Sequence, residues 1–351
     1  LRTFHYSDDD LAYLADLRGN SGERLFTGAF IEHLSRLEPG LGLDIDAMPE
    51  GTVVFPSEPL LRVRGPLLAA QIVETALLNL INFPTLVATN AARVVLAAGG
   101  DAVLEFGLRR AQGPDGGLSA SRAAYLGGCE ATSNVLAGRL FGIPVRGTHA
   151  HSWILSFSDE QEAMDTWAEV QPQNTVLLVD TFDTLDGVRR AIATGKRMRE
   201  EGHELDGIRL DSGDLAYLSR EARRLLDESG FPKARIVASS DLDPETIASL
   251  REQGAAVDTW GVGTRLVTAY DQPALGGVYK LAAVRKGPEE DWRMTVKVSA
   301  DPDKTPVPGI LGARRYYDRA GQAAADMIHD TAAAGAPGDS VVDPVNPRRR
   351  K

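Results

Sequence analysis

The sequence predicts an α/β protein in which a (β/α) barrel follows a smaller α+β domain. From residue 102 onward, short apolar segments alternate with amphipathic helical segments, which is the pattern of repeated βα units. The apolar segments begin roughly 30 to 40 residues apart, the usual length of one such unit. One of them, "TVLLVD", is almost continuously apolar, as expected for a parallel strand that is buried on both faces.

The predicted barrel domain extends over residues 101–274. Its expected strands are residues 102–106, 143–147, 175–180, 207–210, 235–238 and 257–262. An open doubly wound sheet would also place ligands at the carboxyl ends of its strands, and the sequence alone does not separate the two architectures. Six units in one continuous stretch favour the barrel.

Residues 1–100 form the predicted α+β domain. Ser7 and Asp10 have the spacing of a capping box at the start of the first of two short helices. A long helical stretch is expected over residues 67–98, with a break near Pro84, because proline removes a helical hydrogen bond. The strands expected in this domain are residues 52–55 and 60–63.

The part of the chain after the barrel contains further strand-like segments. "GGVYKLAAV" and "MTVKVSA" are rich in β-branched and apolar residues, so residues 275–320 are expected to return in part to the first domain. Residues 321–351 are rich in alanine and glycine and end in "NPRRRK". This stretch is expected to be a solvated C-terminal tail.

Composition excludes several classes of protein. The formal net charge of −11 and the pI of about 5.1 argue against a nucleic-acid-binding protein, which would carry a basic face. Cys129 is the single cysteine, so an intramolecular disulfide and a Cys/His zinc site are excluded, and a cytoplasmic location and a buried thiol are expected. No run of about 18 apolar residues and no signal peptide are apparent, so no membrane span is expected.

Residues able to bind a phosphate follow several of the predicted strands. In "EFGLRRAQGPDGG", Arg109 and Arg110 come just after a strand, where paired guanidinium groups suit a pyrophosphate. A pair of surface arginines that bind no ligand is an equally good interpretation. In "GTHAHSW", a histidine could be a general base, a phosphoryl acceptor or a metal ligand. No neighbouring carboxylate or cysteine completes a metal site, and His149 is expected to be structural.

Three later strand ends complete the pattern. In "RLDSGDL", Asp211 could hold ribose hydroxyls or Mg²⁺, although an N-cap of the following helix is the simpler interpretation. In "ASSDLDP" and "GVGTRL", small residues would let backbone N–H groups approach a phosphate. Together the strand ends predict a ligand that carries phosphates, with a histidine and carboxylates beside it.

These motifs resemble those of a known family. "EFGLRRAQGPDGG", "AHSW" after Gly-Thr, "RLDSGDL", "GVGT" and "GGVYKL" are similar, in order and spacing, to the motifs of nicotinate phosphoribosyltransferases. The similarity extends from about residue 45 to about residue 312. It implies an irregular (β/α) barrel with a β-rich N-terminal domain, and a homodimer with active sites at the subunit interface.

The resemblance also implies a reaction. Nicotinate and phosphoribosyl pyrophosphate would be joined to give nicotinate mononucleotide and pyrophosphate, on a salvage route to NAD. ATP hydrolysis would drive the reaction, with Mg²⁺ accompanying the phosphates. His151 falls at the position of the family's phosphorylated histidine, and Arg209 and Asp211 would face the ribose and its phosphates.

Further residues take roles that the resemblance implies. Ser152 would lie near the nicotinate carboxylate, Phe106 would stack on the pyridine ring, and Arg109 would meet the pyrophosphate or the nicotinate. The residues implied to bind the 5-phosphate are Ser239, Ser240, Gly261, Gly263 and Thr264. The family's N-terminal "TDLYxLTM"-like motif, whose aromatic residue covers nicotinate from the neighbouring subunit, is not found in this sequence.

Two alternatives stay open on the sequence. The first is a nicotinamide or quinolinate phosphoribosyltransferase, which would share the barrel and the phosphate site; the residues around Ser152 and "LRRAQGPDGG" favour nicotinate. The second is a non-catalytic barrel that binds a phosphate-bearing ligand. A substrate competition assay distinguishes a nicotinate enzyme from the first alternative. Product formation distinguishes an enzyme from the second alternative, a barrel that only binds.

Overall fold

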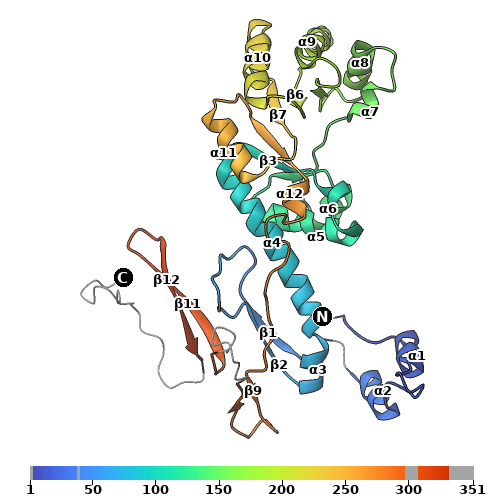
Figure 1. Ribbon diagram of the computed structural model, residues 1–351, viewed down its shortest axis with the longest axis vertical. Helices are drawn as coiled ribbons and strands as arrows, with labels where there is room; N and C mark the ends of the chain where they lie inside the picture. Colours follow the sequence, from blue (N-terminus) through green and yellow to red (C-terminus); the bar gives the residue numbers. More distant parts are fainter. Residues whose placement is uncertain (1–2, 38–39, 297–306, 332–351) are drawn as a thin grey trace. The chain divides into compact units, whose positions relative to one another are not determined.

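The computed structural model describes residues 3–37, 40–296 and 307–331. The chain divides into two compact units (Figure 1). The first unit combines Leu1–Leu78 with Val278–Lys351, and the second is Asn79–Gly277. Every residue expected to carry chemistry lies in the second unit.

The first unit has mixed helices and small antiparallel sheets. α1 begins as expected, because the Ser7 side chain accepts from the Asp10 N–H and Asp10 accepts from Ser7 in return. Leu41, Ala69 and Val73 belong to a small buried cluster. The elements are α1 Asp8–Asp16, α2 Gly28–Ser35, β1 Asp44–Ala47, β2 Leu61–Arg64, α3 Leu67–Ile72, β9 Ala283–Val284, β10 Arg293–Met294, β11 Leu311–Tyr317 and β12 Ala323–Asp330. β1 pairs with β2, β9 with β10 and β11 with β12, all antiparallel.

Two expectations for residues 1–100 were wrong. Residues 52–55 are not a strand; the partner of β2 is β1, Asp44–Ala47, an exposed and mostly polar segment without the apolar pattern of a buried strand. The long helix is divided at Val73 rather than at Pro84, which lies inside α4, Glu74–Ala98. Proline leaves the carbonyl four residues earlier without its helical partner. That residue, Leu80, is 65% exposed, so water can satisfy the carbonyl.

The expected tail contains a strand. β12, Ala323–Asp330, pairs along its whole length with β11, and the Arg315 guanidinium forms an ion pair with Asp326 across the hairpin at 2.6 Å. β12 begins with three alanines, which do not show the alternating pattern of a strand, so the sequence did not predict it. The rest of the expected tail, residues 332–351, lies outside the described residues, as does most of "MTVKVSA".

The second unit is built on one six-stranded parallel sheet, curled into a half-barrel (Figure 1). Its strand order is β4-β3-β8-β7-β6-β5. The strands are β3 Ala102–Glu105, β4 Ala131–Thr132, β5 Val176–Leu178, β6 Gly207–Leu210, β7 Arg235–Ala238 and β8 Thr259–Val262. The helical segments are η1 Leu108–Arg110, α5 Gly113–Leu126, α6 Val135–Phe141, α7 His151–Ile154, α8 Glu160–Val170, α9 Thr184–Glu200, α10 Leu215–Glu228, α11 Pro244–Glu252 and α12 Thr264–Val267. The α/β class and the irregular barrel are confirmed.

β4 and β5 are the two edges of this sheet. The strand expected over residues 143–147 is reduced to a single bridge between Val145 and Thr132. Pro144 has no N–H to donate, and its carbonyl accepts from Thr132 instead. The sheet is therefore open between β4 and β5 within the described residues.

A large apolar core surrounds the sheet. Cys129 is part of it, as predicted, and burial raises the pKa of its thiol to about 12. By length and composition alone, α4 could cross a membrane, with a mean hydropathy of 1.3 over its most apolar stretch. Of this stretch, 22% is buried in the protein. Val87, Ala91, Val94 and Ala98 recur at helical spacing on one face of α4 and pack in this core.

Candidate active site

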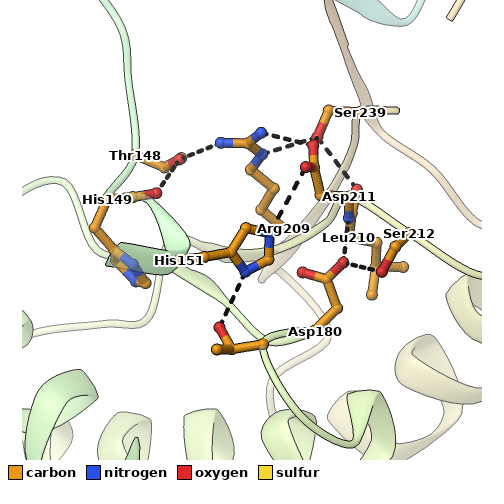
Figure 2. Close-up of polar contacts among 10 residues, drawn as sticks. Thr148, His149, His151, Asp180, Arg209, Leu210, Asp211, Ser212 and Ser239 are labelled. Carbon is orange, nitrogen blue, oxygen red and sulfur yellow. Dashed lines mark hydrogen bonds and ion pairs between the residues drawn. The ribbon is translucent and has the colours of Figure 1, made fainter. Parts of the chain in front are cut away.

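Arg209, at the end of β6, connects three loops at the carboxyl ends of the strands (Figure 2). Its Nε donates to Ser239 Oγ at 2.8 Å, its Nη1 to Thr148 Oγ1 at 3.0 Å and its Nη2 to Asp211 Oδ1 at 2.7 Å. Because the carboxyl ends of parallel strands lie on one side of a sheet, segments distant in sequence meet here. The guanidinium group thus orders much of the predicted site.

Asp211 is the central carboxylate of this group. Ser239 donates its hydroxyl hydrogen to Asp211, and Arg209 forms an ion pair with it. Burial acts to raise the pKa of Asp211, but the hydrogen bond from Ser239 and the charge of Arg209 outweigh burial and lower it below its usual value. Asp211 is therefore ionised at neutral pH.

His151 faces Asp211 from the first residue of α7. Its Nε2 lies 3.7 Å from Asp211 Oδ2, and its Nδ1 lies 3.1 Å from Thr181 Oγ1. The imidazole is 41% exposed, so a ligand can reach it. A histidine held through Nδ1 with Nε2 accessible can act as a nucleophile or as a proton carrier.

Asp180 joins this group although it was not among the predicted site residues. Its Oδ2 accepts from the Asp211 N–H at 3.0 Å and from the Ser212 hydroxyl at 2.6 Å (Figure 2). Its Oδ1 is buried and has no hydrogen-bond partner in the described chain. The sequence did offer one signal: Asp180 is the last residue of the predicted strand 175–180, and other predicted strands also end in polar residues.

Phe106 lies beside the same strand ends. Its N–H donates to the Val262 carbonyl at 2.8 Å, which extends the β3–β8 pairing by one residue. The Arg209 guanidinium carbon is 5.8 Å from the centre of the ring. Gly261 lies against the ring, since a Cβ at this position would be 2.8 Å from Phe106 Cδ2. The structure therefore places Gly261 under the predicted stacking ring.

The other predicted phosphate-binding residues occupy two neighbouring turns. Ser240 follows β7 with a φ of 117°, and Asp241 follows with a φ of 47°, conformations that are strained for residues other than glycine. Gly263 and Thr264 begin α12 directly after β8. No side-chain hydrogen bond or ion pair joins Ser240, Gly263 or Thr264 to the Arg209 group within the described residues.

Arg109 and Ser152 are exposed. Arg109 lies in η1, after β3, and makes no hydrogen bond or ion pair with the part of the chain that the structure describes. Ser152 lies in α7, next to His151. The structure thus brings His151, Arg209, Asp211 and Ser239 into contact. Ser152 follows His151 in the chain, and the structure shows no contact that brings Arg109 to this group within the described residues.

Comparison with known proteins identifies the family. Residues 1–82 match the profile of the nicotinate phosphoribosyltransferase N-terminal domain, and residues 102–320 match that of the nicotinate phosphoribosyltransferase family. The chain is 49% identical over 312 residues to nicotinate phosphoribosyltransferase of Bacillus subtilis, covering 88% of this chain and 61% of that protein. It is 41% identical to the Dictyostelium discoideum protein of the same name, covering 93% of this chain and 62% of that protein.

A solved structure agrees with the sequence comparison. The crystal structure of human nicotinic acid phosphoribosyltransferase has a TM-score of 0.81 and 33% identity, covering 100% of this chain and 76% of that chain. The chain spans about three fifths of the length of the first two relatives, with 61% and 62% of their residues covered. The matches to both domains, the level of identity and the shared fold show that this chain belongs to the nicotinate phosphoribosyltransferase family.

Proposed function

We propose that the protein joins nicotinate to the ribose of phosphoribosyl pyrophosphate, forming nicotinate mononucleotide and pyrophosphate in NAD salvage. The observation that carries the proposal is the contact of His151 with Asp211, 3.7 Å apart, at the strand ends that also hold Arg209. Relatives that are named nicotinate phosphoribosyltransferase support nicotinate as the substrate.

Asp211 would act on the ribose. Substitution at the anomeric carbon passes through an oxocarbenium-like state, and a nearby carboxylate stabilises this cation or holds its hydroxyls. The lowered pKa of Asp211, caused by the Ser239 hydrogen bond and Arg209 against the opposing effect of burial, keeps it charged for this role. The exposed Arg109 offers its donors to the leaving pyrophosphate. Nicotinate needs no general base, because its ring nitrogen already has a free electron pair.

His151 would accept a phosphoryl group from ATP. A bond forms between Nε2 and the γ-phosphorus while the bond from that phosphorus to the bridging oxygen breaks and ADP leaves. Thr181 holds Nδ1 at 3.1 Å, which leaves Nε2 as the attacking nitrogen. The added charge of about −1.5 to −2 would reorder the loops around the pyrophosphate site and raise substrate affinity.

Mg²⁺ would enter with the substrate phosphates. Within the residues that the structure describes, no group of three or more His, Cys, Asp or Glu side chains could hold a metal ion. The ion would therefore take most of its ligands from phosphate and water, with Asp211 as a nearby carboxylate. Asp180 Oδ1, buried and without a partner, is a further oxygen that fits this chemistry. Bound there, Mg²⁺ would offset the charge of the leaving pyrophosphate.

Labelling and product formation test the proposal directly. The complete gene product, supplied with nicotinate, phosphoribosyl pyrophosphate, Mg²⁺ and γ-³²P-ATP, should form nicotinate mononucleotide and carry label on one histidine. His151→Ala should lose the label, whereas the control His203→Ala should keep it. Label that persists in His151→Ala would refute the phosphohistidine.

The alternatives give different results in the same assay. Nicotinamide or quinolinate, each added in place of nicotinate, should give no comparable product, and neither should compete well with nicotinate. A barrel that only binds a phosphate-bearing ligand would form no nucleotide with any of the three. We also propose a cytoplasmic location and a homodimer. Sedimentation at several protein concentrations would test the homodimer, and cell fractionation would test the location.

A further inference from the structure

β5 leaves one of its backbone donors without a strand partner. Along a strand, successive N–H groups point to opposite sides. The Val179 N–H donates to the Arg209 carbonyl of the neighbouring segment at 3.2 Å, so the Leu178 N–H faces away from β6. That side is the open edge of the sheet. Leu178 is 1% exposed, so water does not reach this donor.

A side chain takes the place of the absent strand. His149 Nε2 accepts the Leu178 N–H at 3.2 Å, and His149 itself is 4% exposed. The His149 ring meets the Trp167 ring edge to face, with centres 5.1 Å apart. Without this acceptor, the buried Leu178 N–H would lose its only partner among the described residues, which costs free energy comparable to a lost hydrogen bond.

The segment that carries His149 is held on both sides. Thr148, which precedes His149, accepts from Arg209 at 3.0 Å and donates to the His149 carbonyl at 3.0 Å. His151, two residues later, contacts Thr181 at 3.1 Å. In Figure 2 the rings of His149 and His151 point in different directions from one short segment.

We infer that His149 is a positioning residue, which fastens the segment before His151 to the open edge of the half-barrel and so holds the His151 ring between Thr181 and Asp211. The role of His151 rests on the proposed function, but the fastening itself does not. The two histidines thus have different roles. The His149 imidazole accepts the N–H at the sheet edge, and the His151 imidazole faces the ligand.

The hydrogen bond from Leu178 determines which nitrogen of His149 is protonated. An N–H donor requires a free electron pair on Nε2, so the ring proton must be on Nδ1. Burial lowers the pKa of His149 to about 4, opposed by the Ala150 backbone and helped by the charges of Arg209 and His151. Nδ1 is buried and has no hydrogen-bond partner among the described residues. The ring is therefore neutral at pH 7 and available as an acceptor.

Two variants distinguish the effect of the hydrogen-bond acceptor of His149 from the effect of its aromatic ring. His149→Gln keeps a neutral oxygen acceptor near the place of Nε2, whereas His149→Phe keeps an aromatic ring without an acceptor. His33→Gln on α2, an exposed histidine, is the control for substitution itself. The chain has six histidines, few enough for ¹⁵N-histidine spectra to be assigned by substitution.

The first measurement is the ¹⁵N spectrum of His149 at pH 7, together with hydrogen exchange at the Leu178 amide. The expected results are a neutral ring with unprotonated Nε2, and exchange that is about tenfold or more faster in His149→Phe, but not in His149→Gln, because a buried hydrogen bond is lost only in the first. A protonated Nε2, or equal exchange in both variants, would overturn the inference.

The second measurement follows His151 without turnover. The ¹⁵N chemical shifts of its ring at pH 7 should change in His149→Phe, because the distances to Thr181 and Asp211 change, and should return in His149→Gln. Unchanged ring shifts in His149→Phe would show that His149 does not position His151. Phosphorylation by ATP is a separate arm. Its absence in every variant, including the wild type, would refute the proposed function and leave the spectroscopic test unaffected.

Discussion

His149 and Asp211 have lowered pKa values for different physical reasons. Burial dominates at His149 and disfavours the charged imidazolium. At Asp211 burial opposes the shift, and the hydrogen bond from Ser239 together with Arg209 overcomes it. At neutral pH there is therefore an uncharged acceptor toward β5, two residues before His151 in the chain, and a charged carboxylate 3.7 Å from the His151 ring.

The first prediction concerns stability in acid. The folded-state pKa of His149 is about 4, below its ordinary value of 6.5, so the unfolded chain binds this proton more readily between those pH values. The contribution of His149 to stability is present above about pH 6.5 and is lost as the pH falls toward 4, by about 3 kcal/mol at most. Urea unfolding of the wild type at several pH values measures it.

The matched variant is His149→Gln, which does not titrate. Its free energy of unfolding should change less than that of the wild type between pH 6.5 and 4. Asp211, whose pKa is also lowered, affects a separate range, because its contribution is lost only as the pH falls below the ordinary aspartate value of 3.8. Parallel pH profiles for the wild type and His149→Gln would contradict the prediction.

The second prediction concerns the ring of Phe106. A methyl group at Gly261 would meet Phe106 Cδ2 at 2.8 Å, while Ser239 Cβ would be at an ordinary 3.5 Å. Gly261→Ala should therefore displace the ring and raise the KM for nicotinate roughly tenfold or more, since a misplaced binding group loses affinity. Phosphorylation of His151 should change little. An unchanged KM would show that the ring does not contact the pyridine.

At the scale of elements, α9 packs closely on the end of β5. A Cβ at Gly187, in the first turn of α9, would overlap the Val179 carbonyl oxygen. Gly187→Ala should destabilise the protein by roughly 2 kcal/mol or more through overpacking. Gly116→Ala in α5, where the nearest atom is Gln112 Cβ at 3.8 Å, should instead be neutral or slightly stabilising. Thermal unfolding compares the two, and equal effects would contradict the packing argument.

Elements with a strong apolar period could be predicted from the sequence, and short or polar ones could not. The strands at 207–210 and 235–238 have the predicted bounds, because most of their residues are buried and the apolar ones, such as Ile208 and Ile236, indicate a strand. β4, with two residues, and β1, with alternating aspartates, lack such a pattern. Their pairing depends on distant partners, which local composition does not reveal.

At the scale of the whole molecule, the motifs predicted which strand ends carry polar side chains, and the parallel sheet explains why they meet. The contacts of Arg209 with Ser239 and Thr148 join positions far apart in the sequence, so no local pattern indicated them. The same applies to the link from His149 to Leu178, which exists because the sheet is open. Predicting these contacts requires the strand order, which spacing alone does not determine.

The last prediction follows from the different cores of the two units. The buried cluster of the first unit consists of Leu41, Ala69, Val73 and Leu77, whereas that of the second unit surrounds the whole parallel sheet. Since opening a region costs free energy in proportion to the apolar surface exposed, at about 25 cal/mol per Å², the first unit should open more easily. Amides of β11–β12 should then exchange faster than those of β6–β7, after correction for intrinsic rates.

Hydrogen exchange followed by mass spectrometry measures the exchange rates of the β11–β12 hairpin and of β6–β7 in one experiment. Repeating it at two protein concentrations separates internal stability from association, because protection that comes from a second copy increases with concentration. Exchange of β11–β12 as slow as that of β6–β7 at both concentrations would contradict the prediction. It would mean that packing within the first unit contributes more than its small buried cluster indicates.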